Sequence, residues 1–340
     1  MLAVLHKFDG KVYTMDIPKP QPKEYEVVVK IKYAGLCDDE MKIIGGSTDY
    51  YRSYTSYNSY QGIGHEASGI IEQSCPKAEE MGLVVGTHVT IHPYLRCGTC
   101  KYCRNGRENL CINRKYTMRM MCEYVVVDYR CVYKLPDDVS LLNGCLTQPI
   151  ACVMRTIEQA GISFGQSVAI IGNSFSSIIM IILSRMRGAK TITAVGLDAN
   201  YKRAAIEHGA DYTFSMQDQD DLIRAMNVTS NNGYDVVLEA SSYYHSKEAA
   251  LALLARGGTI VFFSNVNINT VVSFSSFELF WKEAIIKTSF DFPYLYPKTI
   301  SCIAQMDLSQ LTKDIFPVSD VQSAYEYMYY GRVLRAIVEF

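Results

Sequence analysis

The stretch Ser167-Val-Ala-Ile-Ile-Gly172-Asn-Ser-Phe-Ser-Ser177 decides the architecture of the central part of the chain. It reads as a short apolar strand that ends in glycine, a polar turn, and the start of a helix-like run over residues 178–187. In parallel sheets the backbone N–H groups of such a helix start face nucleotide phosphates. The candidate cofactor-binding residues of this turn are Gly172, Ser174, Phe175, Ser176 and Ser177.

Strand-like and helix-like segments alternate after this turn. The strand-like runs cover residues 191–195, 235–239 and 257–263, with helical runs between them. The alternation predicts an α/β fold with a doubly wound parallel sheet of the Rossmann type. The dinucleotide fingerprint G-x-G-x-x-G keeps only its first glycine here, so the turn suits either altered nucleotide binding or a plain strand-turn-helix without ligand.

The overall composition excludes several functional classes. The chain has 340 residues, a formal net charge of −2, 49% hydrophobic and 20% charged residues. A near-neutral charge disfavours nucleic acid as a partner, and the longest apolar run, near residues 178–183, is well short of the ~20 residues that span a bilayer. The start of the chain shows no secretory signal. We therefore expect a cytoplasmic protein of two domains with no membrane or nucleic-acid partner.

Four of the eleven cysteines follow a metal-binding spacing, C-x2-C-x2-C-x7-C. Four thiolates suit a closed, tetrahedral, structural zinc site. A group of reduced thiols and an iron–sulfur cluster are the alternatives, but the spacing matches neither common ferredoxin pattern. The predicted structural zinc ligands are Cys97, Cys100, Cys103 and Cys111.

Two shorter pieces supply a second pair of metal ligands. Cys37 follows a strand-like run, and His65 with Glu66 precedes another. Taken singly, a buried cysteine is more often a small apolar residue and a histidine more often a structural one. Their order around the four-cysteine segment favours half of an open zinc site.

The ordered set of motifs resembles the zinc-containing medium-chain dehydrogenases/reductases, in particular the polyol branch with sorbitol and galactitol-phosphate dehydrogenases. The resemblance covers almost the whole chain. It rests on Gly35-Leu-Cys37, Gly64-His65-Glu66, Val85-Gly86, the four-cysteine segment, Gln148-Pro149, Gly209-Ala210-Asp211, Gly257-Gly258 and Gly331-Arg-Val-Leu-Arg335. It implies a GroES-like (chaperonin-10-like), β-rich catalytic domain over residues 1–148 and 285–340, with a zinc lobe over 93–115, and a Rossmann cofactor domain over 149–284.

The resemblance also assigns a catalytic zinc site. Cys37 and His65 correspond to zinc ligands, and Glu66 to the adjacent carboxylate, which lies either on the metal or behind it. The family often has a glutamate where this chain has Gln148. A neutral amide is a poorer zinc ligand than a carboxylate. Either Gln148 coordinates weakly, or Glu66 substitutes for it, or the catalytic zinc is loosely held.

Asp39 departs from the serine or threonine that relays a proton in the family. A carboxylate there could act as general base, or it could restore charge near a zinc site that lacks its glutamate. The third reading is a surface acid in the run of residues 38–40.

Cofactor choice depends on the end of the second Rossmann strand. Alignment on Gly209-Ala210-Asp211 places Gly196 where an acidic residue would select NAD(H), with Lys202 and Arg203 following. This favours NADP(H), although Asp198 would reverse the choice if the strand ended later. The resemblance makes Arg335 a candidate ligand of the cofactor pyrophosphate.

The resemblance implies a zinc-dependent oxidoreductase that transfers hydride between NAD(P)(H) and the zinc-bound alcohol or carbonyl of a small molecule. Its substrate would be an alcohol, a polyol, a ketose, an aldehyde or a polyol phosphate. The tyrosine-rich segment 50–60 with Arg52 offers either a surface for such a substrate or a set of rings that pack the loop on the lobe or on a partner subunit. The chain would form a homodimer or homotetramer. The alternative is a zinc- and nucleotide-binding member of the family with altered or lost catalysis.

Overall fold

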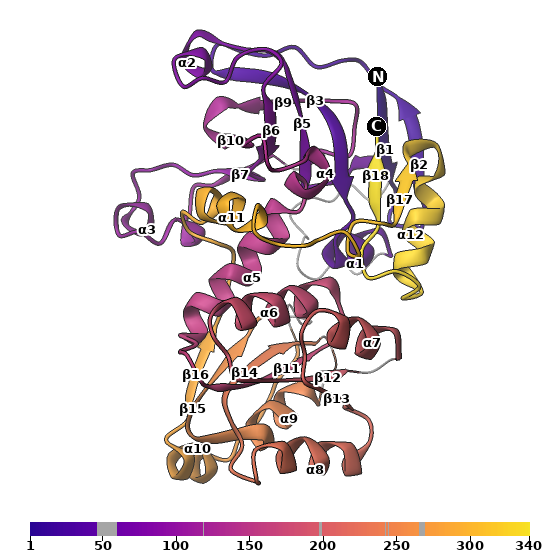
Figure 1. Ribbon diagram of the computed structural model, residues 1–340. Helices are drawn as coiled ribbons and strands as arrows, with labels where there is room; N and C mark the ends of the chain where they lie inside the picture. The colour runs from indigo at the N-terminus through magenta and orange to yellow at the C-terminus, as the bar shows by residue number, and fades with distance from the viewer. Residues whose placement is uncertain (46–59, 118, 197–198, 242, 244, 265–268) are drawn as a thin grey trace. The chain divides into compact units, whose positions relative to one another are not determined.

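The computed structural model describes residues 1–45, 60–117, 119–196, 199–241, 243, 245–264 and 269–340 (Figure 1). The chain divides into two compact units. The first contains residues 1–151 and 293–340, and the second contains residues 152–292. In the described part of the chain, no helix combines the length and the apolar content that a membrane crossing requires.

The first unit is built on sheets that are antiparallel except for the parallel pair of β17 and β18. Its largest sheet has the order β10-β6-β5-β3-β18-β17, with β9 also paired to β3. These strands are β3 (Glu26–Gly35), β5 (Ala67–Gln73), β6 (His88–Ile91), β9 (Tyr124–Asp128), β10 (Val132–Lys134), β17 (Ile315–Pro317) and β18 (Ile337–Glu339). A smaller sheet, β2-β1-β4, contains β1 (Leu2–His6), β2 (Val12–Asp16) and β4 (Gln61–Gly62).

Strand β3 is the centre of the first unit because it pairs with three other strands. Val27, Val29 and Ile31 are at most 1% exposed and pack in the main apolar core. β5 and β9 run antiparallel to β3, and β18 pairs with its last residues. The run of β-branched residues explains why this segment forms a strand buried on both faces.

Short helices complete the first unit. They are α1 (Asp38–Ile44), α2 (Pro76–Glu79), α3 (Lys101–Arg104), α4 (Leu141–Gly144), α11 (Tyr296–Ile303) and α12 (Val321–Tyr329), with single 3-10 turns η2 (Glu108–Leu110), η3 (Tyr129–Cys131) and η4 (Val318–Asp320). The longer helix α5 (Thr147–Ala160) begins in the first unit and ends in the second.

The second unit is a parallel sheet with the order β13-β12-β11-β14-β15-β16. Its strands are β11 (Ser167–Gly172), β12 (Thr191–Gly196), β13 (Tyr212–Ser215), β14 (Tyr234–Ala240), β15 (Leu254–Phe262) and β16 (Ile285–Thr288). Helices cover both faces, with α6 and α7 on one and α8, α9 and α10 on the other (Figure 1). They are α6 (Phe175–Met186), α7 (Ala199–Glu207), α8 (Gln219–Val228), α9 (Ser246–Leu253) and α10 (Ser276–Lys282). The predicted doubly wound sheet is confirmed.

Both boundaries between the two units differ from the predicted ones: residue 151 ends the first segment in place of 148, and residue 293 begins the returning segment in place of 285. Strand β16 pairs in parallel with β15, from Thr259 with Ile285 to Phe262 with Thr288. Residues 285–292 therefore lie with the parallel sheet, and residues 149–151 lie with the first unit. Strand β16 was not assigned to the parallel sheet from the sequence because a strand of four residues has too little periodicity to be recognised alone.

The buried hydroxyl of Tyr234 links three elements of the second unit. It lies 2.9 Å from Thr193 Oγ1 in β12 and 2.7 Å from the carbonyl oxygen of Ala225 in α8. The Tyr234 side chain is fully buried. Removing the hydroxyl would leave the Ala225 carbonyl without this partner in an apolar environment, which is costly.

We therefore expect Tyr234→Phe to lower the free energy of unfolding of the second unit by about 1–2 kcal/mol. Urea unfolding followed by fluorescence measures this change. Tyr212→Phe is the matched control, because Tyr212 is 46% exposed and should tolerate loss of its hydroxyl. Equal stability of the two variants would show that the buried bridge contributes nothing.

Candidate metal and nucleotide sites

The four-cysteine lobe forms a tight cluster of sulfur atoms. Strands β7 (Tyr94–Leu95) and β8 (Lys115–Tyr116) pair at its base and hold the ends of the loop together. The Sγ atom of Cys97 lies 3.5 Å from that of Cys111 and 4.0 Å from that of Cys103, and Cys100 lies 3.6 Å from Cys103. A tetrahedral zinc with Zn–S bonds of about 2.3 Å needs S···S separations of about 3.8 Å. The four sulfurs therefore fit the ion.

The local charges of the lobe also suit a metal. Backbone N–H groups of Thr99 and Cys100 point at the Cys97 sulfur and lower its pKa to about 5. Burial raises the pKa of Cys103 to about 12. The Cys97 sulfur is thus already a thiolate near neutral pH, whereas zinc would have to displace a proton from the Cys103 sulfur.

A buried ion pair attaches this lobe to the rest of the first unit. Arg96 Nη1 lies 3.1 Å from Glu108 Oε1, and the same oxygen accepts the backbone N–H of Tyr294 at 2.7 Å. Tyr294 belongs to the segment that returns from the second unit. Glu108 therefore has a structural role within the charged stretch around the cysteines.

A second group of metal-ligating atoms lies at one edge of β3 and β5. Cys37 directly precedes helix α1, just beyond the end of β3, and His65 and Glu66 directly precede β5. Because Ala34 pairs with Ala67, the two motifs lie side by side. The ligand atoms of Cys37, His65 and Glu66 all lie within 4.8 Å of one another. This donor set of thiolate, imidazole and carboxylate suits zinc.

Glu40 supports this group from behind and is the residue that sequence reasoning missed. It is 1% exposed, and its Oε2 accepts the backbone N–H of Cys37 at 2.9 Å. Its Oε1 accepts the N–H of Gly64 at 2.8 Å and lies 3.1 Å from His65 Nδ1. The spacing of Cys37 and Glu40, the N-cap and third residue of α1, matches a capping box and was the available signal.

The Glu40 carboxylate also sets the protonation of His65. Burial alone would lower the pKa of His65, but Glu40 outweighs burial and raises it above its usual value. The pKa of Glu40 is correspondingly lowered, although burial opposes this. A proton held on Nδ1 by Glu40 leaves Nε2 as the atom that can bind a metal.

Glu66 has a different partner, the guanidinium of Arg335. Strand β18 pairs with β3 so that Ile337 faces Gly35, which brings Arg335 into an ion pair with the fully buried Glu66 carboxylate. A Cβ atom on Gly35 would lie 2.5 Å from Glu66 Oε2, so glycine makes room for the pair. Arg335 was predicted to bind the cofactor pyrophosphate, and in this structure its partner is Glu66.

Gln148 and Asp39 are the other residues predicted for the catalytic zinc site. Gln148 is buried at the start of α5. Asp39 lies in the first turn of α1, and its Oδ1 is 3.8 Å from Lys42 Nζ. Among the described residues, the second group of metal-ligating atoms consists of Cys37, His65 and Glu66, without Asp39. Coordination by Gln148 and proton relay by Asp39 stay predictions.

The nucleotide turn uses its serines to cap α6. The backbone N–H of Ser174 donates to Ser177 Oγ at 3.0 Å, and Ser177 Oγ donates to the Ser174 carbonyl at 2.7 Å. A Cβ on Gly172 would lie 2.6 Å from that of Ser177, so the glycine is needed for this approach. The Ser177 hydroxyl therefore takes part in the cap of α6. Phe175 is buried, which leaves its backbone as the only part suited to a phosphate.

Residue 196, at the end of β12, has no room for a side chain. A Cβ there would lie 2.2 Å from the ring of Tyr201, which is fully buried. Lys202 and Arg203 lie on α7, and Arg203 Nε is 3.9 Å from Glu207 Oε1. Asp198, Arg52 and the tyrosine-rich segment up to residue 59 lie outside the described residues.

Each of the two units contains a region that matches a known protein family. A family model described as alcohol dehydrogenase GroES-like domain matches residues 23–137, and one described as zinc-binding dehydrogenase matches residues 177–305. A solved structure of a provisionally named zinc-binding dehydrogenase from Clostridium scindens is 30% identical, covers 100% of this chain and 98% of that chain, and has a TM-score of 0.93. The predicted combination of a GroES-like and a Rossmann domain is confirmed.

Two further relatives have named substrates. D-xylulose reductase A from Aspergillus niger is 24% identical over 95% of this chain and 92% of that protein. Galactitol-1-phosphate dehydrogenase from Escherichia coli is 21% identical, with a TM-score of 0.87 and full coverage of both chains at 100%. At that identity the second likeness shows the fold alone.

The position of Glu40 predicts that Glu40→Gln weakens zinc binding at the Cys37 group. The amide keeps the shape but loses the charge that holds the proton on His65 Nδ1, so affinity should fall about 10- to 100-fold. Competition with a chromogenic chelator, on protein whose four-cysteine lobe is already loaded, measures this. Glu72→Gln is the control, because Glu72 pairs with Lys19 in a partly exposed position away from this group. An unchanged affinity would refute the supporting role of Glu40.

Proposed function

Because the chain belongs to the zinc-binding dehydrogenase family of alcohol dehydrogenases, we propose that it transfers hydride between a nicotinamide dinucleotide and the CH–OH or carbonyl carbon of a polyol-like molecule. The observation that carries the proposal is the grouping of the Cys37, His65 and Glu66 ligand atoms within 4.8 Å. The parallel sheet with its glycine turn after β11 supplies the expected dinucleotide site.

The residues of the first unit would hold and tune a zinc ion. Cys37 and His65 would be its ligands, with Glu66 or Gln148 as the third. When bound, zinc would polarise the substrate carbonyl and lower the pKa of the alcohol. Glu40 keeps the His65 ring oriented through Nδ1, and Arg335 balances the charge of the buried Glu66 carboxylate.

Asp39 is the proposed proton carrier. Its side chain is 31% exposed, so it can exchange a proton with water. It lies two residues after Cys37, the position of the hydroxyl relay in the family. A carboxylate there would take the alcohol proton during oxidation and return it during carbonyl reduction.

We propose NADP(H) as the preferred cofactor. Tyr201 fills the space beside Gly196 that an acidic side chain would need to bind the ribose 2′-hydroxyl. Lys202 and Arg203 follow on α7 and provide cations for a 2′-phosphate. Backbone N–H groups at the start of α6 would meet the pyrophosphate.

The proposed substrates are ketoses and polyols or their phosphates, by analogy with the xylulose reductase and galactitol-phosphate dehydrogenase relatives. The chain would then act on a hydroxylated small molecule. The alternative, a family member with altered or lost catalysis, draws on two observations. A neutral amide, Gln148, stands at the position of a ligand, and Arg335 already engages the Glu66 carboxylate.

We expect purified protein to oxidise NADPH in the presence of xylulose or another ketose, and Cys37→Ala to lower kcat/KM about a thousandfold, equivalent to about 4 kcal/mol of transition-state stabilisation. Absorbance at 340 nm over a panel of ketoses, ketose phosphates and aldehydes measures this. Cys75→Ala is a matched control, since Cys75 is also a cysteine at the N-cap of a helix.

Three results would count against parts of the proposal. Equal activity of Cys37→Ala and wild type would remove the catalytic zinc assignment. A clear preference for NADH would overturn the cofactor choice. Binding of zinc and dinucleotide without turnover over the whole panel would favour the alternative.

We further propose that a second copy of this chain covers an aromatic face on the second unit. Phe277, Phe280 and Trp281 of α10 are 68%, 76% and 56% exposed; α10 packs on β15, the neighbour of β16, which is the edge strand of the sheet as described. An exposed apolar face beside an open strand edge is typical of a homo-oligomer interface.

Light scattering should therefore give a dimer or tetramer for the wild type, and Phe280→Asp should shift the mass towards the monomer. Phe164→Asp is the control, because Phe164 is 93% exposed but lies away from α10 in the sequence and outside this face. A wild-type mass equal to one chain at micromolar concentration would contradict the interface.

A further inference from the structure

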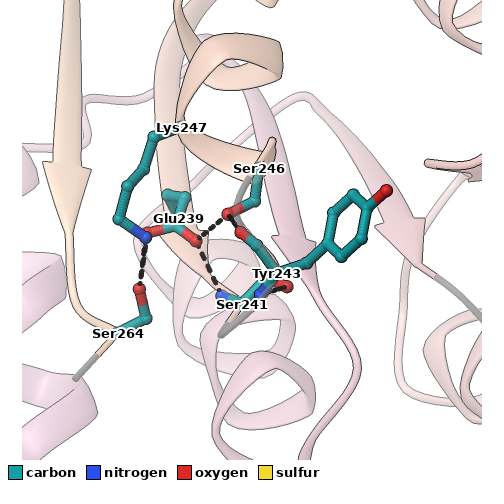
Figure 2. Close-up of polar contacts among 6 residues, drawn as sticks. All are labelled: Glu239, Ser241, Tyr243, Ser246, Lys247 and Ser264. Atoms are coloured by element: carbon teal, nitrogen blue, oxygen red, sulfur yellow. Dashed lines mark hydrogen bonds and ion pairs between the residues drawn. The ribbon is translucent and has the colours of Figure 1, made fainter. Parts of the chain in front are cut away.

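A buried polar network lies at the end of β14, outside the groups described above. Glu239 is fully buried, and its carboxylate accepts four hydrogen bonds (Figure 2). Oε1 accepts the Ser241 N–H at 2.9 Å and the Ser246 hydroxyl at 2.7 Å. Oε2 accepts Lys247 Nζ at 3.1 Å and the Ser264 hydroxyl at 2.7 Å.

Lys247 closes the network with a second bond. Its Nζ donates to Ser264 Oγ at 2.9 Å, and its side chain is 7% exposed. Figure 2 shows Lys247 and Ser246, both from α9, approaching the Glu239 carboxylate from opposite sides. The network therefore links the end of β14, the start of α9 and Ser264, which lies two residues after the end of β15.

The network also contacts the main chain of Tyr243, which lies between β14 and α9. The backbone N–H of Tyr243 donates to Ser241 Oγ at 3.1 Å. The Tyr243 carbonyl oxygen lies 2.6 Å from Ser246 Oγ, so it competes with Glu239 Oε1 for the single proton of that hydroxyl.

The location of the network in the sheet points to the cofactor. The strand order reverses between β11 and β14, and ligands of such sheets bind outside the carboxyl ends of the strands at this point. Ala240 pairs with Gly172, so Glu239 lies one residue before the level of the phosphate turn on the neighbouring strand. Each half of such a sheet binds one mononucleotide, so with the phosphate turn after β11 the half that starts with β11 would receive the adenosine part and the half that starts with β14 the nicotinamide part.

Stability alone does not account for a buried ion pair here. Desolvation of two charges costs about as much as their attraction returns, and apolar replacements are often equally stable. The pair does leave the cluster without net charge, whereas an unpaired carboxylate next to the phosphate turn would repel an anionic dinucleotide. Both considerations favour a role in placing the ligand.

We propose that Glu239, Lys247 and Ser264 are positioning residues for the nicotinamide half of the dinucleotide. Their network links Ser241, just after β14, to Ser264, two residues after β15, at the carboxyl edge of the sheet. This inference rests on the proposed function, since it needs a dinucleotide at that edge.

Titration of the full-length, zinc-loaded chain with NADPH and with ADP tests this proposal, since ADP lacks the nicotinamide half. Lys247→Met should weaken NADPH binding about tenfold, the scale of a moderate coupling between two sites, and leave ADP binding within about twofold. Ser264→Ala keeps both charges and threatens folding less. It should weaken NADPH binding in the same selective way, by a smaller factor.

Lys282→Met is the matched control. Lys282 also pairs with a glutamate, Glu278 at 3.3 Å, and donates to the Leu251 carbonyl near the other end of α9. It should leave both dissociation constants unchanged.

The possible results distinguish the positioning role from the proposed function. Unchanged NADPH affinity in Lys247→Met or in Ser264→Ala, or equal losses for NADPH and ADP, would overturn the positioning role while the proposed function stands. Failure of the wild type to bind either NADPH or NADH would overturn both.

Discussion

The antiparallel pairing of β3 with β5 is the constraint on which the candidate metal site depends. It brings the residue after the end of β3, Cys37, next to the residues before the start of β5, His65 and Glu66. The pairing of β18 with β3 then adds Arg335 from the end of the chain. The site is therefore assembled by strand register, and a slip of one residue would move these side chains to opposite faces.

Buried carboxylates with individual cationic partners recur through the structure. Glu40 pairs with His65, Glu66 with Arg335, and Glu239 with Lys247. A buried charge without a partner is costly, so each carboxylate and its partner must be considered together. In the first unit the pairs prepare a place for a cation. In the second unit the pair leaves the edge of the sheet neutral, as suits an anionic ligand.

The features that short stretches of sequence encode were predictable from the sequence. The spacing from Cys97 to Cys111 predicted the sulfur cluster because four ligands within one short loop must lie close together. The alternation after Ser167 predicted the parallel sheet. Contacts between distant segments were not predictable in the same way. The pairing of Arg335 with Glu66 follows from strand order, and the Glu239 network requires Lys247 and Ser264 to converge across two strands and a helix.

The first unit carries two groups of zinc-ligating atoms of different kinds, one of four sulfurs and one of sulfur, nitrogen and oxygen. Metal analysis of the purified chain by mass spectrometry counts the ions that they hold. We expect two zinc ions per chain in the wild type, with loss of one in Cys37→Ala and loss of the other in Cys100→Ser. A single zinc per wild-type chain, with no loss in Cys37→Ala, would contradict this expectation.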